Sequence, residues 1–150
     1  MLIAKKYLSK EDLQFLSEKI AEAEKKTSGE ILVVIRHRRH WKERKLSLHD
    51  LALQEFHKLG MHNTKGRTGV LVLMLMSEQK FQIIADEGIH SKVEDGTWDA
   101  IAEAMSTHFK RRNFRDGIAE AIAAVGERLA KHFPREKDDK DELPDGIIEH

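Results

Sequence analysis

Two continuous apolar runs constrain the fold of this chain more than any other feature. Residues 30–35 (Glu-Ile-Leu-Val-Val-Ile) and 70–76 (Val-Leu-Val-Leu-Met-Leu-Met) are too short for helices and rich in β-branched or long apolar side chains, which favours strands. Neither run alternates apolar with polar residues, so each strand is expected to be covered on both faces. Residues 48–59 between them have helical spacing. The pattern predicts a strand-helix-strand unit with parallel neighbouring strands and a right-handed connection.

A third strand is predicted at residues 81–85, and the short turn at residues 77–79 makes it antiparallel to the second. Apolar side chains at three- and four-residue steps predict about four helices. The first begins near Ser9, the second follows Ser47 and ends at Gly60 in the left-handed region, the third covers residues 97–109, and the last ends before Pro134. The chain is therefore expected to be an α/β domain with a small mixed sheet of three to four strands.

Length and composition indicate a single domain. The chain has 150 residues, of which 40% are hydrophobic and 35% charged, and this excludes a disordered chain. The longest apolar run, residues 70–76, is far below the roughly 18 residues that span a bilayer, so we expect no membrane partner. The absence of cysteine excludes disulfides and thiol nucleophiles and fits a cytoplasmic protein, which we expect to be a monomer.

The C-terminal segment differs in composition from the rest of the chain. Residues 1–134 are expected to form the domain and residues 135–150 an acidic, flexible tail. A small apolar patch at residues 143–148 leaves a second interpretation open, in which the tail docks on the domain.

A basic run at residues 36–45 follows the first strand, where ligands of open α/β sheets usually bind. Arginine side chains suit phosphate oxygens, and Trp41 could stack on a base. The alternative is a solvated basic loop. A formal net charge of +0 disfavours nucleic acid as a partner. The candidate anion-binding residues are Arg36, Arg38, Arg39 and Arg67.

Acidic residues cluster between the third strand and the helix that follows it. Oxygen ligands of this kind favour Ca²⁺ or Mg²⁺. The alternative is that Asp95 caps the helix and that its acidic neighbours are solvated. The candidate metal ligands are Asp86, Glu87, Asp95 and Asp99.

Several ordered motifs together resemble the TPM domain family. They are Lys26-Thr27-Ser28-Gly29-Glu30-Ile31, Leu59-Gly60-Met61-His62, Arg67-Thr68-Gly69-Val70-Leu71, Asp86-Glu87-Gly88-Ile89, His108-Phe109, His132-Phe133-Pro134 and Glu142-Leu143-Pro144-Asp145. The resemblance implies a three-layer α-β-α sandwich. It covers thylakoid-lumen proteins linked to photosystem repair and acid phosphatase activity, membrane-anchored relatives, and short bacterial proteins that this chain resembles most.

The resemblance also bears on individual residues. In some relatives an acidic loop after the strand hairpin is associated with divalent metal, and Asp86 and Asp95 best match that region. Where relatives often have glycine after the third helix, this chain has Arg111-Arg112-Asn113, so we expect Asn113 in the left-handed conformation there.

Two functions follow as expectations. The preferred one is a binding or accessory domain that binds a divalent cation at the acidic loop and contacts an unidentified protein partner. The alternative is a metal-assisted phosphomonoesterase, in which Asp86 and Asp95 hold the ion and an arginine of the basic run clamps phosphate. The alternative requires the two loops to meet, which depends on the order of the strands in the sheet.

Overall fold

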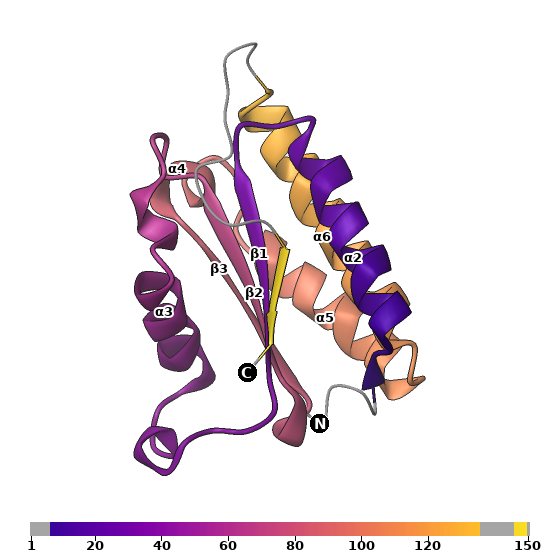
Figure 1. Ribbon diagram of the computed structural model, residues 1–150. Coiled ribbons are helices and arrows are strands. Elements are labelled where there is room, and N and C mark those ends of the chain that lie inside the picture. Colours follow the sequence, from indigo (N-terminus) through magenta and orange to yellow (C-terminus); the bar gives the residue numbers. More distant parts are fainter. Residues whose placement is uncertain (1–6, 136–145, 150) are drawn as a thin grey trace.

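A central sheet with helices on both faces forms the fold, as seen in a computed structural model that describes residues 7–135 and 146–149 (Figure 1). In this part of the chain the strands are β1 (Glu30–Arg36), β2 (Gly69–Leu75), β3 (Lys80–Ala85) and β4 (Gly146–Glu149). The helices are α2 (Lys10–Glu24), α3 (Leu48–Lys58), α4 (Glu87–His90), α5 (Thr97–Lys110) and α6 (Phe114–His132). Three short 3-10 turns complete it: η1 (Trp41–Glu43), η2 (Met61–Asn63) and η3 (Met76–Glu78).

The strand order is β3-β2-β1-β4, and the sheet is mixed as predicted. β1 and β2 are parallel, with Ile31 opposite Val70 and Arg36 opposite Leu75. β3 is antiparallel to β2, so that its last residue, Ala85, pairs with Val70. The carboxyl end of β3 therefore lies beside the amino end of β2, at the end of the sheet where β1 also begins.

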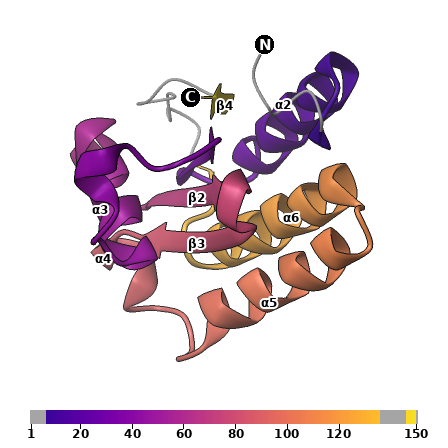
Figure 2. The same ribbon diagram turned by 90° about the horizontal axis from the view of Figure 1, so that it is seen from below.

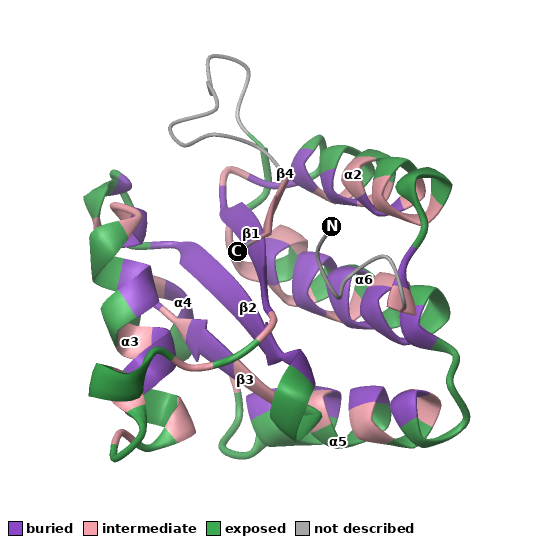
Figure 3. Ribbon diagram, turned by 60° about the horizontal axis from the view of Figure 1, so that its bottom comes forward, coloured by how far each residue is buried: buried purple, intermediate pink, exposed green. Residues whose placement is uncertain are grey.

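The three predicted layers are present. Figures 1 and 2 show α3 on one face of the sheet and α2, α5 and α6 on the other. Every residue of β1 and β2 is buried (Figure 3). Ile31, Val33 and Ile35 pack toward the three-helix face, and their neighbours Leu32 and Val34 pack toward α3. Because both faces are covered, a continuous apolar strand is stable in the interior, where each buried aliphatic side chain contributes about 1.5–3 kcal/mol.

Local signals at the helix ends are mostly confirmed. Ser9 caps α2 through a reciprocal bond with Asp12, and Ser47 caps α3. Gly60 has φ of 73° after α3, as expected.

The prediction for the end of α5 was wrong by one residue, since Arg112 has φ of 60° and Asn113 has φ of −92°. The amides of Arg112 and Asn113 donate to the carbonyls of Phe109 and His108, a pairing that requires the left-handed residue at position 112.

The C-terminal strand comprises residues 146–149 and adds a fourth member to the sheet. They pair in parallel with β1, with Leu32 opposite Gly146 and Ile35 opposite Glu149. Ile147 packs against the three-helix core and Ile148 against the α3 core. The Glu-Leu-Pro-Asp motif and the rest of the segment 136–145 lie outside the described residues.

Candidate functional site

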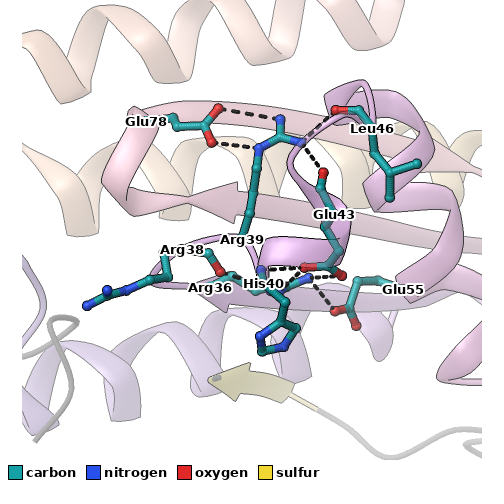
Figure 4. Close-up of polar contacts among 8 residues, drawn as sticks. All are labelled: Arg36, Arg38, Arg39, His40, Glu43, Leu46, Glu55 and Glu78. Carbon is teal, nitrogen blue, oxygen red and sulfur yellow. Dashed lines mark hydrogen bonds and ion pairs between the residues drawn. The ribbon is translucent and has the colours of Figure 1, made fainter.

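The basic loop, residues 36–45, leaves the carboxyl end of β1 and folds around Arg36, whose side chain points inward (Figure 4). This side chain is only 3% exposed. Its guanidinium donates to both carboxylate oxygens of Glu43, at 2.6 and 3.1 Å, and to Glu55 of α3 at 3.2 Å. The pairing connects the end of β1, the η1 turn and α3 through one buried cation.

Arg39 forms a second internal connection. It donates to the Glu78 carboxylate at 2.6 Å, and to the backbone carbonyl oxygens of Glu43 at 3.0 Å and Leu46 at 2.6 Å (Figure 4). Glu78 belongs to η3, in the turn between β2 and β3. Arg39 thus fastens the basic loop to the neighbouring hairpin.

Glu43 is the electrostatic centre of this arrangement. Besides accepting from Arg36, it accepts from the backbone amide of His40 at 2.8 Å. The hydrogen bonds and charge of Arg36 lower the pKa of Glu43 to about 2 and raise the pKa of Arg36 in return. Both groups stay charged at neutral pH, and their role is to hold the loop.

Side chains that point outward give the basic loop its surface. Arg38 is exposed and lies 3.2 Å from the His37 ring nitrogen. Trp41, at the start of η1, is 73% exposed, and the Lys42 ammonium lies 5.7 Å from its ring centroid. Arg44 and Lys45 are also exposed. Three of the four predicted anion-binding arginines, Arg36, Arg38 and Arg39, lie in this loop. Of these three, Arg38 is the one whose side chain is exposed to solvent.

The start of α4 holds the other predicted charges. Asp86 is 5% exposed and accepts two hydrogen bonds from Arg67, each 2.8 Å long, together with one from the backbone amide of Glu87. Arg67 has φ of 56° and a side chain that is 51% exposed. The Asp86 carboxylate raises the pKa of Arg67. Asp86 therefore acts as the N-cap of α4 and is paired with an arginine at the surface.

The α4 turn packs closely on the segment that carries Arg67. A Cβ atom at Gly88 would lie 2.0 Å from the carbonyl oxygen of Gly66 and 2.5 Å from that of Arg67, so only glycine fits. The Asp86 amide donates to Gly69, and the Glu30 amide donates to Thr68. Motifs that are far apart in sequence thus meet at the amino ends of β1 and β2.

The other two predicted metal ligands, Asp95 and Asp99, line cavities that Asp86 does not line. Asp95 lines a cavity of about 400 Å³ between α5 and α6, whereas Asp99 lines one of about 370 Å³ beside β3 and α3. In the described residues, no group of three or more His, Asp or Glu side chains is placed to hold a metal. The cap of α5 is Gly96, so Asp95 does not have the capping role considered from the sequence.

The basic loop and the acidic loop lie at opposite ends of the sheet. Arg36 ends β1 beside Leu75, whereas Asp86 follows Ala85, which pairs with Val70 at the other end of β2. Five residues of strand separate these ends by about 16 Å. The two loops therefore do not meet, because β3 runs antiparallel to β2 and its carboxyl end lies at the amino end of β2. Of the predicted anion-binding residues, only Arg67 meets Asp86.

Sequence reasoning missed the three glutamates that organise the basic loop. Glu43 is the single acid between Arg36 and Ser47, and this isolation was a usable signal. Glu55 falls on the buried face of α3 beside Phe56, which marks it as a side chain in need of a buried partner. No local signal identifies Glu78, because its partner Arg39 is 39 residues away.

Among the solved structures that resemble this one are three determined by NMR. The NMR structure of BA42 protein from the psychrophilic bacterium Bizionia argentinensis is 38% identical, covers 96% of each chain and has a TM-score of 0.85. An N-terminal domain of a P. gingivalis protein is 20% identical, covers 87% of this chain and 83% of its own, and has a TM-score of 0.70. The N-terminal domain of cg2496 protein from Corynebacterium glutamicum is 15% identical, covers 95% and 81%, and has a TM-score of 0.54. The last two show a shared fold.

Three further findings concern curated proteins, the membrane and the family. A search among curated proteins found no significant match. Within the described residues, no helix has the length and apolar character needed to cross a bilayer. The TPM domain model matches residues 3–128, which is most of the chain. The chain therefore belongs to the TPM domain family.

Proposed function

We propose that this chain is a binding domain and that it takes up a divalent cation, Ca²⁺ or Mg²⁺, at the start of α4 in exchange for Arg67. The observation that carries the proposal is the contrast within the ion pair: Asp86 is 5% exposed, whereas Arg67 is 51% exposed. The carboxylate is held in place by the α4 amide of Glu87, while its counter-ion lies on the solvent side. An exposed arginine can swing away and leave a preorganised anionic oxygen pair.

The surrounding donors are oxygens, which suits hard cations. Glu87 is exposed next to Asp86. The carbonyl oxygens of Gly66 and Arg67 approach the α4 turn at Gly88. Asp86 and Glu87 are therefore the residues that would hold the ion, with backbone carbonyls as further donors. Asp95 and Asp99 have no part in this proposal, because they line separate cavities.

The phosphomonoesterase alternative loses its main support. It required an arginine of the basic loop beside the metal carboxylates, and these groups lie at opposite ends of the sheet. Arg36 and Arg39 are in addition engaged by Glu43, Glu55 and Glu78. The binding function requires none of these arginines to move.

The test is an NMR titration of the full chain with calcium chloride and, separately, magnesium chloride. We expect amide shifts centred on Arg67 and on residues 86–89, loss of these shifts in Asp86→Asn, and tighter binding in Arg67→Gln because the competing cation is gone. Glu94→Gln serves as the control, because it removes an acidic charge outside the proposed site. Shifts that persist in Asp86→Asn, or that Arg67→Gln weakens, would contradict the exchange.

A further inference from the structure

The outward face of the basic loop has no role in the fold or in the proposed cation site. It consists of Trp41 and the cations Arg38, Lys42, Arg44 and Lys45, all exposed. We propose that this face is a docking surface for an anionic phospholipid bilayer, in which Trp41 inserts at the headgroup level and the four cations contact lipid phosphates. The contact is peripheral and involves no membrane span.

The loop is held rigid from inside. Arg36 joins Glu43 to Glu55 of α3, and Arg39 joins the Leu46 carbonyl to Glu78 (Figure 4). These bonds cross from the loop to two neighbouring elements. Because the turn is already ordered, docking Trp41 requires little further loss of backbone freedom, and this favours binding.

The charge on the outward face is unbalanced. Within the described residues none of its four cations has a carboxylate partner, and the single acid of the loop, Glu43, is bound to Arg36. The chain as a whole has a formal net charge of +0. The positive field is therefore local, and it acts on a dense anionic surface at short range.

Trp41 is the large apolar side chain that the described residues leave exposed, at 73%. Trp98, by contrast, is 9% exposed and donates to His90. A tryptophan ring is amphipathic and prefers the membrane interface, and flanking lysines keep their ammonium groups in water while their stems lie along apolar surface. Lys42 flanks Trp41 in this way, with its ammonium 5.7 Å from the ring centroid.

A bilayer fits this face better than nucleic acid does. The segment between β1 and α3, which contains η1, extends beyond the ends of the strands (Figure 1), and this position is accessible to a flat partner. Sites for single-stranded nucleic acid combine a basic groove with several stacking aromatics. Trp41 is the one Trp, Tyr or Phe between Arg36 and Ser47.

The experiment uses the full chain and vesicles of phosphatidylcholine with one third phosphatidylglycerol. We expect the tryptophan emission to shift to shorter wavelength on binding, and no shift with pure phosphatidylcholine. Trp41→Phe should abolish the shift, since Trp98 is already buried. Arg44→Glu with Lys45→Glu should weaken partitioning at least about 25-fold, because each cation near such a surface contributes about fivefold. Raised salt should weaken it as well.

Two matched measurements decide the remaining outcomes. Lys19→Glu with Lys26→Glu changes the same charge on α2 and the segment after it, and should leave vesicle binding almost unchanged. Poly-uridine tests the nucleic-acid partner in the same buffer. Vesicle binding that is equal in both double variants, an unshifted Trp41 emission, or binding to poly-uridine with inert vesicles would each overturn the proposal.

Discussion

Arg36 and Glu55 form a buried ion pair between the end of β1 and α3, with 3.2 Å between Arg36 Nη1 and Glu55 Oε1. Both side chains are less than a tenth exposed. The pair spans 19 residues of sequence and fixes where the basic loop begins. Glu43 is a second carboxylate partner of Arg36, so that this one buried cation connects β1, the η1 turn and α3.

Removing Glu55 should destabilise the domain. Glu55→Ala leaves the buried Arg36 with the Glu43 carboxylate and the Arg38 carbonyl oxygen, and loss of one member of a buried pair typically costs about 3–5 kcal/mol. Since Glu43 stays in place, we expect a loss of about 2–3 kcal/mol in urea unfolding. Glu22→Ala is the control, because the Lys19–Glu22 pair at 3.5 Å is exposed and worth less than about 1 kcal/mol. Equal losses in both variants would contradict a structural role for Glu55.

The pKa of Glu43 predicts a specific acid sensitivity. Its ordinary value of 4.5 is lowered to about 2 in the folded chain, so the folded state binds this proton less readily than the unfolded state. The resulting stability is present above pH 4.5 and is lost as the pH falls toward 2. At about 1.4 kcal/mol per pKa unit it amounts to roughly 3 kcal/mol at most. Urea unfolding between pH 5 and 2 should show a shallower loss in Glu43→Gln than in the wild type.

Gly88 and Gly96 offer a matched pair of glycine substitutions. Gly88→Ala places a Cβ atom 2.0 Å from the backbone oxygen of Gly66, which cannot move away as a flexible side chain does. We expect a loss of more than about 3 kcal/mol. Gly96 has φ of 84° and nothing within 4 Å of its Cβ position, so Gly96→Ala should cost only the left-handed strain of about 1–2 kcal/mol. Thermal unfolding of the two variants measures the difference, and a smaller effect at Gly88 would contradict the close packing of α4.

Much of the fold follows from local pattern. The apolar runs predict β1 and β2 because a strand that is buried on both faces is apolar at nearly every position. Ser9 and Ser47 mark helix starts through side-chain hydrogen bonds to nearby backbone amides, and Gly60 marks a helix end through its left-handed backbone.

The site depended on pairings that sequence distance conceals. An arginine in a basic run looks like a ligand for phosphate until Glu55 and Glu78 are placed beside it by the sheet. The antiparallel direction of β3 was predicted from the sequence. That Asp86 and Arg36 therefore lie at opposite ends of the sheet becomes clear only when both are related to β2, which pairs with β1 and with β3. β4 is four residues long and follows an acidic segment, so its own sequence gives little indication of a strand. Its pairing depends on the edge of β1, which β4 covers.

The edge of β1 that β4 covers should respond to loss of the C-terminal segment. The Glu30 amide donates toward β2 and the Ile31 amide toward Glu24 on the opposite side, at 2.8 Å. By the alternation of a strand, the amides of Val33 and Ile35 face β4, whereas those of Leu32 and Val34 face β2.

Deleting residues 136–150 removes Ile147 and Ile148 from the two cores and should destabilise the domain by more than about 1 kcal/mol. Hydrogen exchange should accelerate at Val33 and Ile35 beyond the change in global stability, while Leu32 and Val34 follow the global value. Ile148→Asp in the full chain tests the same edge without shortening it, and unchanged protection of Val33 and Ile35 in both variants would show that β4 contributes nothing to the sheet.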